Sequence, residues 1–243
     1  MLTKKNRVWA VVALLTGIIG FSSCLKNDNN YTPQRPQAQI AIIGSSTSMI
    51  PGTFYDNDQK VTETEFNYNF YARYAVYGGL HKFDLKKKGG DSLFTSTTYN
   101  FDSTQYYTYL IWDKAPVRSA IIKTDQSNYS RDKIGIRFLN LSQNAGPVDV
   151  YVGAEKIDSN RVYFDGNVSA ASAFKLYSSF STGSTITIRE AGTTNKLAEV
   201  SGADLKIGTF NTGYFYTIYL MGVKGSSGTD KLYTNAIFSL YNY

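Results

Sequence analysis

The chain has 243 residues, with 25 Lys or Arg against 19 Asp or Glu, for a formal net charge of +6. Hydrophobic residues make up 42% and aromatic residues 15%, which excludes a disordered chain because there is ample apolar surface to bury. A single Cys and a single His exclude an intramolecular disulfide, a zinc site built from several Cys and a metal site built from several His.

The N-terminus has the pattern of a secretory leader. Lys4, Lys5 and Arg7 form a basic start, and Val8–Phe21 follows without a charge. This apolar run is shorter than the roughly 20 residues of a membrane-spanning helix, whereas a secretory signal peptide has a short apolar run of this kind. We expect residues 1–23 to be a signal peptide. Its removal also lowers the positive charge, so the composition gives no reason to expect a nucleic-acid partner.

The only Cys of the chain stands where a lipoprotein leader ends. Phe21-Ser22-Ser23-Cys24 resembles the lipobox of bacterial lipoproteins, in a form similar to that of Bacteroidetes-type bacteria. The resemblance implies acylation of Cys24 and anchoring in the outer membrane, on either its periplasmic or its outer side. Several acyl chains anchor a protein stably. The alternative is an ordinary secretory signal with an incidental Cys. Residues 24–37 are polar and predict a tether after the lipid.

The rest of the chain predicts short β-strands. Ile134, Ile136 and Phe138 alternate with other residues, as do the aromatic and aliphatic residues of 214–221, and Gly, Asn, Asp and Ser clusters separate such runs. We therefore expect an all-β fold of two tandem immunoglobulin-like antiparallel β-sandwich domains. The expected boundaries are 38–125 for the first repeat, 126–132 for a linker and 133–243 for the second repeat.

The two halves align with each other. Ile40–Val61 matches Ile136–Ile157, and Tyr106–Ile111 matches Phe215–Leu220. Later, Ala120-Ile121-Ile122 matches Ala236-Ile237-Phe238. Because the spacing between matched segments changes in loop-like stretches, the pattern indicates a duplicated domain.

One family resemblance appears in the second half. Ile136–Ile157, and above all Val148-Asp149-Val150-Tyr151, resembles the domain of unknown function 4397 family. The likeness extends from Ile136 to Met221, many relatives have a His where Asn140 stands, and the first repeat is a degenerate copy. The resemblance implies a β-sandwich outside the cytoplasm, often in lipoproteins or cell-wall-linked proteins, and it implies no catalytic residue.

The sequence offers little catalytic chemistry. His81 lies in a strand or turn, and no Gly-x-Ser-x-Gly motif supplies a nucleophile for it. Asp56-Asn57-Asp58 has the oxygen ligands of a calcium loop but lacks the rest of the spacing, so a turn between strands is the better interpretation. Lys86-Lys87-Lys88 fits a solvated hairpin loop. We expect no catalytic residue, metal or cofactor.

Tyrosine is unusually abundant, with 20 residues. The matched strands carry aromatic residues on both faces, so we expect them to be central strands covered on both sides or to border an interface. Tyr106, Phe215 and Tyr219 are weak candidates for ligand binding, because exposed aromatic rings stack on sugars or anchor partners. The alternative is that they build the sheet. The end of the chain, Leu232–Tyr243, predicts a last strand that pairs internally or adds to a partner.

Three functions remain open. The first is a non-enzymatic membrane-anchored lipoprotein that presents its sandwiches for binding an envelope protein or a glycan. The second is a structural spacer or assembly subunit of a surface complex. The third and least favoured is a carbohydrate-active enzyme that uses paired carboxylates.

Overall fold

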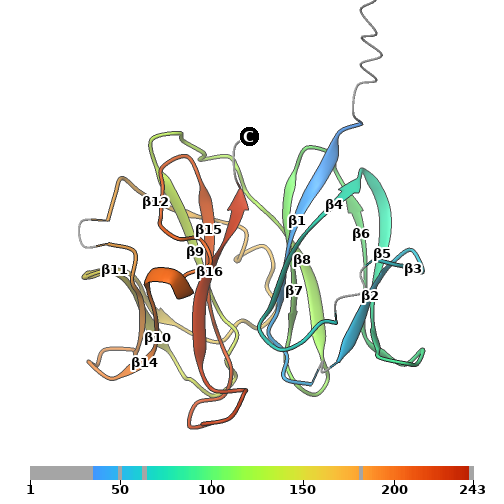
Figure 1. Cartoon of the computed structure of the whole chain (residues 1–243). Helices are drawn as coiled ribbons and strands as arrows, with labels where there is room; N and C mark the ends of the chain where they lie inside the picture. The colour runs from blue at the N-terminus through green and yellow to red at the C-terminus, as the bar shows by residue number, and fades with distance from the viewer. Residues whose placement is uncertain (1–34, 49–50, 62–64, 181–182, 241–243) are drawn as a thin grey trace, which may run out of the picture. The chain divides into compact units, whose positions relative to one another are not determined.

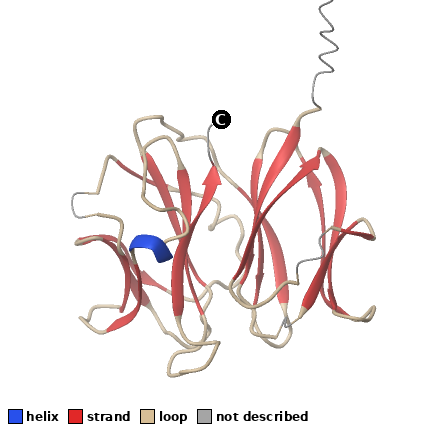
Figure 2. Cartoon of the chain, in the orientation of Figure 1, coloured by secondary structure: helices blue, strands red, loops and turns tan. Residues whose placement is uncertain are grey.

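The structure is a computed structural model that describes residues 35–48, 51–61, 65–180 and 183–240. Within these ranges it contains sixteen strands and one 3-10 turn, Gly202–Asp204 (Figure 2). In chain order the strands are β1 (Gln37–Gly44), β2 (Gly52–Asp56), β3 (Gln59–Lys60), β4 (Phe70–Tyr77), β5 (Gly79–Lys87), β6 (Leu93–Phe101), β7 (Tyr106–Trp112), β8 (Arg118–Lys123), β9 (Ile134–Asn140), β10 (Val148–Val152), β11 (Glu155–Arg161), β12 (Lys175–Tyr177), β13 (Ile186–Glu190), β14 (Lys196–Val200), β15 (Phe215–Met221) and β16 (Tyr233–Leu240) (Figure 1).

The first eight strands form one β-sandwich, called here the first sandwich. One sheet has the order β4-β1-β7-β8 and the facing sheet the order β3-β2-β5-β6. Neighbouring strands are antiparallel except for β1 and β7, which are parallel. Alternate side chains point between the two sheets, and residues such as Ile40, Phe54 and Phe83 form its buried core.

The last eight strands form the second sandwich in the same way. Its sheets have the orders β12-β9-β15-β16 and β11-β10-β13-β14. Each strand thus takes the place of the strand eight positions earlier, and the parallel pair recurs as β9 and β15. The described strands pair only within their own sandwich. The predicted all-β fold with two β-sandwiches is confirmed.

The strand registers show how the halves correspond. Tyr55 lies opposite Lys60 across the β2–β3 turn, and Tyr151 lies opposite Lys156 across the β10–β11 turn. In the parallel pairs, Ile40 is in register with Tyr107, just as Ile136 is with Tyr216. The predicted alignment of these segments is confirmed at the level of single residues.

The predicted correspondence of the last strands is wrong by one residue. Ile121 lies opposite Tyr109, and Ala236 lies opposite Ile218, the residue equivalent to Tyr109. Ile121 therefore corresponds to Ala236 and not to Ile237. A one-residue shift moves every side chain to the other face of the sheet. Both faces of β16 are buried, with Ala236 on one and Ile237 on the other, so the apolar residues of its sequence fit either register.

The matched strands β7 and β15 are covered on both faces, as predicted. Tyr107 and Tyr109 point into the core of the first sandwich, whereas Leu110 and Trp112 belong to a different buried cluster on the opposite face. In β15, all seven residues are buried.

The second cluster joins the two sandwiches and is called here the junction cluster. Its members come from β1, β7, β8, β9, β15 and β16, from the residue directly after β9 and from the loop before β12. They are Ala41, Ile43, Leu110, Trp112, Ile122, Leu139, Leu141, Phe164, Ala171, Tyr219, Met221 and Ile237. Because these side chains bury one another, the residues from Pro36 onward form one compact unit.

A buried arginine crosses the same junction. Arg137 of β9 is 5% exposed, and its guanidinium donates hydrogen bonds to the hydroxyls of Thr217 (2.7 Å) and Thr108 (2.5 Å). It also donates to the carbonyl of Ala171 (3.0 Å) and lies 4.8 Å from the ring centre of Phe174. A single side chain thus binds strands of both sandwiches.

A membrane-spanning helix is not among the elements of the described ranges, where no helix is both long and apolar enough to cross a bilayer.

Candidate functional site

Cys24, the predicted site of lipidation, lies outside the described residues, as do the predicted leader and most of the tether. The anchor therefore stays a prediction from the sequence. The first described strand begins at Gln37, the last residue assigned to the tether.

The aromatic candidates for ligand binding are mostly core residues. Phe215 is 0% exposed and Tyr219 is 1% exposed, while Tyr106 is half-buried. Phe215 packs against Phe174 in a small cluster that Tyr106 borders, and Tyr219 belongs to the junction cluster. The structure corrects the expectation for Phe215 and Tyr219, because their rings fill cores and present no face to a ligand.

His81 is part of a structural polar cluster. Its Nδ1 lies 2.8 Å from Oδ1 of Asp56, and its Nε2 lies 3.0 Å from the carbonyl oxygen of Tyr77. The hydroxyl of Tyr74 donates to Oδ2 of Asp56 at 2.9 Å. These contacts tie β2, β4 and β5 together. Among the described contacts of His81, no serine, threonine or cysteine is in position to act as a nucleophile.

Asp56-Asn57-Asp58 forms the turn between β2 and β3, as predicted. Asn57 and Asp58 have φ values of 48° and 64°, a conformation that Asn and Asp tolerate in tight turns. The side chain of Asn57 accepts a hydrogen bond from the backbone N–H of Lys82 at 2.9 Å. Within the described part of the chain, no three His, Cys, Asp or Glu side chains gather to hold a metal ion.

A hollow opens where corresponding loops of the two sandwiches meet, and it is called here the junction hollow. Its volume is about 280 Å³. It is lined by residues that follow β1 and β7 in the first sandwich and β9 and β15 in the second. They are Ser45, Thr47, Asp113, Lys114, Leu141, Gln143, Asn144, Gly222 and Val223. Thr47 and Gln143 hold equivalent places in the repeats, so the duplication itself creates this hollow.

Asp113 of the junction hollow has an unusual backbone conformation and several polar partners. Its φ is 65°, and the equivalent residue of the second sandwich is Gly222, with φ 96°. The Asp113 carboxylate accepts hydrogen bonds from Gln143 Nε2 (2.6 Å) and the Tyr163 hydroxyl, and Arg118 lies 3.6 Å away. A residue other than glycine whose backbone is held in the left-handed conformation costs energy, and such strain is common at functional sites. Here, bonds to the second sandwich offset it.

The other polar groups of the junction hollow are held by short contacts. Asn144 donates to the carbonyl of Lys224 (3.1 Å) and accepts from its backbone N–H (2.8 Å). The ammonium of Lys224 pairs with Glu190 at 2.5 Å, and this hydrogen bond lowers the pKa of Glu190. Lys114 is exposed at the rim, and it forms no ion pair with a described residue. The hollow therefore combines a carboxylate, two carboxamides, two hydroxyls and an ammonium group.

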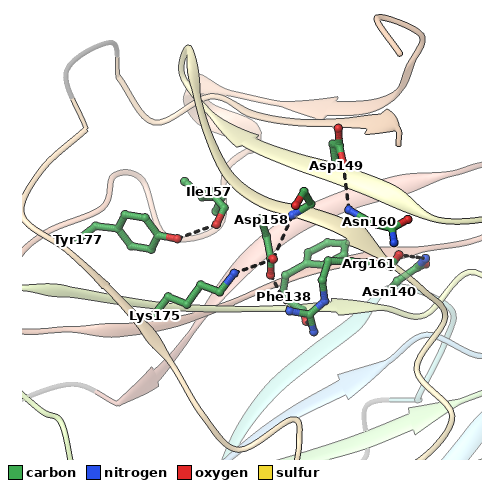
Figure 3. Close-up of polar contacts among 10 residues, drawn as sticks. Phe138, Asn140, Asp149, Ile157, Asp158, Asn160, Arg161, Lys175 and Tyr177 are labelled. Carbon is green, nitrogen blue, oxygen red and sulfur yellow. Dashed lines mark hydrogen bonds and ion pairs between the residues drawn. The ribbon is translucent and has the colours of Figure 1, made fainter. Parts of the chain in front are cut away.

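The Asp of the Val148–Tyr151 segment is a structural anchor, and Figure 3 shows its hydrogen bond with the backbone of Asn160. Asp149 has a side chain 3% exposed, and it accepts hydrogen bonds from Lys156 Nζ (2.7 Å) and from the backbone N–H groups of Asn160 (3.0 Å) and Gly192 (3.1 Å). Burial by itself raises the pKa of this carboxyl, but these hydrogen bonds outweigh it and hold the pKa below its usual value. Asp149 thus joins β10 to β11 and to the β13–β14 turn.

A family model described as a domain of unknown function (DUF4397) matches residues 38–151. The chain contains a DUF4397-like domain. The match begins in β1, runs through the first sandwich and ends at Tyr151 in β10. The match therefore includes the first repeat, which was predicted to be degenerate, and it ends with the Val148–Tyr151 segment. No curated protein matches the chain.

Most of the junction hollow lies within the DUF4397 match. Gly222 and Val223 follow β15, and every other lining residue falls inside residues 38–151. The match also includes Asn140, where the resemblance implies a His in many relatives. Its side-chain amide donates to the carbonyls of Gly146 (3.1 Å) and Arg161 (3.2 Å), so it braces the β9–β10 loop beside the hollow.

The roles of two residues were not predicted from the sequence. Arg137 is a lone charge within an otherwise apolar strand, a pattern that could have indicated a buried polar contact. Asp113 directly follows Trp112 at the end of an apolar strand, and its φ is positive. An Asp at such a strand end is a signal for a loop residue with left-handed backbone. Neither signal reveals the partners, because Thr108 for Arg137, and Gln143 and Tyr163 for Asp113, come from the other sandwich.

Proposed function

We propose that the protein is a lipid-anchored protein of the bacterial cell envelope that binds a glycan at the junction hollow without transforming it. Acyl chains on Cys24 hold the mature chain at the outer membrane, and residues 24–37 serve as its tether. The observation that carries the binding role is the lining of the junction hollow, where polar groups from both sandwiches converge on one small volume.

The size and chemistry of the junction hollow favour one sugar unit over a protein loop. Its volume of about 280 Å³ is just below the roughly 300–1,000 Å³ typical of sites for drug-sized molecules, which fits a ligand as small as one sugar unit. Asp113, Gln143 and Asn144 have planar polar ends, which suit neighbouring hydroxyls, because the carboxylate accepts hydrogen bonds and each carboxamide both donates and accepts. Among its described contacts, Gln143 uses amide hydrogens, and its carbonyl oxygen can accept a further bond. Leu141 and Val223 supply apolar surface.

The same lining favours binding over hydrolysis. Glycoside hydrolysis uses two carboxyl groups placed on either side of the scissile bond. Asp113 is the single carboxylate among the residues that line the hollow, and it is already bonded to Gln143 and Tyr163. A site of this composition can orient a sugar but lacks an acid–base pair.

The glycan role is tested by blocking the junction hollow. Binding of N-acetylglucosamine, galactose, mannose and their disaccharides to the full-length protein in detergent is measured by saturation-transfer NMR and calorimetry. We expect Thr47→Trp, which fills the hollow, to abolish binding. Thr194→Trp, the same change on an exposed turn outside the lining, should leave it intact. Equal binding by both variants, or no binding of any sugar by the unmodified protein, contradicts the proposal.

The anchor is tested separately. Cys24→Ala should move the protein out of the membrane fraction of fractionated cells, and Ser22→Ala, which keeps a small residue before the cysteine, should not. Membrane association of the Cys24→Ala variant contradicts lipid anchoring. Protease treatment of intact and lysed cells then shows which side of the outer membrane carries the sandwiches.

A rigid spacer is the second candidate function, and the junction cluster favours it. Apolar side chains and Arg137 bind the two sandwiches together, so they form one stiff unit. A spacer in a surface complex should give a defined protein partner on cross-linking in intact cells. Recovery of the monomer alone counts against this role.

A further inference from the structure

Among the described strands, one long strand of the first sandwich, β6, is paired on one side only. β6 is the outermost strand of its sheet, where it pairs with β5. The free N–H and C=O groups along such an edge are a template for another strand. β6 has nine residues, which is longer than the usual strand of about five or six. Its length suffices for an extended ladder with a partner.

β6 lacks the features that normally block edge-to-edge pairing. Its sequence is LFTSTTYNF, with no charged residue and no proline. Natural edge strands commonly carry lysine, proline or inward-pointing charges that prevent association. Thr, Tyr and Phe favour extended backbone and fit a pleated sheet. The composition of β6 therefore favours strand pairing.

Other edges of the described sheets are protected. β14, the equivalent of β6 in the second sandwich, carries the ion pair of Lys196 with Glu199. β4, the other edge of the sheet that contains β8, carries Arg73 near its middle. β8 begins with Arg118 and ends with Lys123. β11 carries four charged residues in its seven positions, and β3 and β12 are only two and three residues long. The contrast between the equivalent strands β6 and β14 is the clearest, because the repeats share one topology.

The uncharged edge strand β16 is covered instead. Most of its side chains are buried, and the segment after the 3-10 turn lies against it. The side chain of Asn235 accepts a hydrogen bond from the Lys206 backbone (2.9 Å) and donates one to the carbonyl of Asp204 (2.8 Å). β6 has no such cover from the described residues, and Ser96, Thr98 and Asn100 are exposed along it.

Side-chain hydrogen bonds hold β6 in its extended form from the inside. The hydroxyls of Thr95 and Thr97 lie 2.7 and 2.5 Å from the hydroxyl of Ser119 on β8. On the outer face, Ser96 donates to Asp84 of the neighbouring strand at 2.5 Å. A strand that is already ordered loses little conformational entropy when it pairs.

We propose that β6 pairs with β6 of a second copy of this chain, antiparallel about a two-fold axis. In such a pair the nine residues of one β6 lie opposite the same nine residues of the other. Because β6 has no charged residue, the pairing brings no like charges together. Threonine and aromatic cross-strand pairs add stability. Self-pairing of β14 or β11 would bring charged side chains together across the axis. The sheet that contains β6 contributes no residue to the junction cluster, so the pairing leaves the junction hollow open.

The mass of the full-length protein in detergent, measured by sedimentation over a range of concentrations, tests the pairing. We expect a reversible monomer–dimer equilibrium. Thr98→Lys places a charge on β6 in both copies and should weaken the dimer about tenfold or more. Asn100→Lys, at an exposed position near the end of β6, supplies an independent variant if Thr98→Lys fails to fold. Ser201→Lys, at the position of the second sandwich equivalent to Thr98, is the matched control and should leave the dimer unchanged.

Three results overturn the proposal. They are a monomer at every concentration, a dimer that both β6 variants leave intact, and a dimer that Ser201→Lys weakens as much as Thr98→Lys does. The outcome is independent of glycan binding, because Thr98 and Asn100 do not line the junction hollow.

Discussion

Thr108 of β7 and Thr217 of β15 hold the same place in the two sandwiches, and both accept a hydrogen bond from Arg137. In the parallel strand pairs, Thr217 is in register with Arg137 and Thr108 with Ala41. Arg137 therefore replaces an alanine of the first repeat, and its long side chain spans the junction to reach both threonines. The duplication places two equivalent threonine hydroxyls at the junction. An Arg in place of the equivalent Ala then links the two sandwiches by donating to both.

The first prediction concerns this link. Arg137 has no carboxylate among its described partners, and burial lowers its pKa. Arg137→Ala leaves a cavity and strands the hydroxyl of Thr108 and the carbonyl of Ala171 without their donor. We expect a loss of about 3 kcal/mol in the free energy of unfolding, measured with urea. Arg137→Met, which fills most of the space, should cost about 1 kcal/mol less.

Arg131→Ala is the control for this prediction, since Arg131 is exposed. It should change the free energy of unfolding by less than about 0.5 kcal/mol. If Arg137→Ala costs no more than Arg131→Ala, the guanidinium contributes nothing to the junction and the rigid-unit argument fails with it.

Arg137 also marks the limit of what the sequence could predict. The alternation of Ile136 and Phe138 predicts a strand, and both side chains lie in the core of the second sandwich, because period-two alternation depends on neighbouring residues alone. The opposite face of the strand is buried by residues from the other sandwich, far away in the sequence. The local sequence pattern does not show which distant residues cover this face. The junction hollow, which lies between the two sandwiches, therefore could not be predicted from it.

The shift between the last strands has a similar cause. A bulge between Phe215 and Tyr216 changes the pairing of β15 with β16, and both Ile237 and Ala236 are buried. Where one face of a strand is polar, alternation fixes the register; where both faces are apolar, two registers look alike. The matched Tyr55 and Tyr151 aligned correctly because tight turns fix their registers.

The second prediction is an acid effect at Asp149. Its pKa is lowered in the folded protein, so its contribution to stability is complete above the unfolded pKa, near 3.8, and is lost as the pH falls through the folded value. Asp149→Asn keeps the shape but removes the charge that Lys156 and two backbone N–H groups bind. We expect this variant to lose about 1–3 kcal/mol at neutral pH.

The pH dependence separates the charge from the shape. Urea unfolding at pH 7 and at steps from pH 5 down to pH 2 should show the gap between the unmodified protein and Asp149→Asn closing as the pH falls. Asp204→Asn, at an exposed aspartate, should follow the unmodified protein throughout. A constant gap over this range would mean that hydrogen-bond geometry alone, and not the carboxylate charge, stabilises the turn.

The third prediction concerns close packing at Gly135. A Cβ atom at this position would lie 2.2 Å from Cδ1 of the Phe215 ring, which is itself packed against Phe174. We expect Gly135→Ala to cost about 1–3 kcal/mol by displacing that ring. Gly90→Ala, where nothing lies within 4 Å of the new atom, should be near neutral. Adding Phe215→Leu to Gly135→Ala should recover part of the loss if the ring is the cause.

The fourth prediction compares Asp113 with its equivalent, Gly222. At position 113, glycine relieves the left-handed strain but loses the bonds to Gln143 and Tyr163, whereas alanine loses the bonds and keeps the strain. Asp113→Ala should therefore be less stable than Asp113→Gly by about 1 kcal/mol, with the unmodified protein the most stable of the three. Urea denaturation of the three proteins under one condition gives the order directly.

Replacing Gly222 by alanine should also destabilise the protein, but for a different reason. A Cβ on Gly222 would lie 2.3 Å from the carbonyl oxygen of Lys231, a backbone atom that cannot swing aside. We expect Gly222→Ala to cost 3 kcal/mol or more, roughly the loss that follows from forced overpacking added to strain. If Gly222→Ala costs no more stability than Asp113→Ala, then the loops after β7 and β15 are held by the same kind of constraint. The wall of the junction hollow would then owe its shape to chain geometry alone, and not to the bonds that Asp113 makes across it.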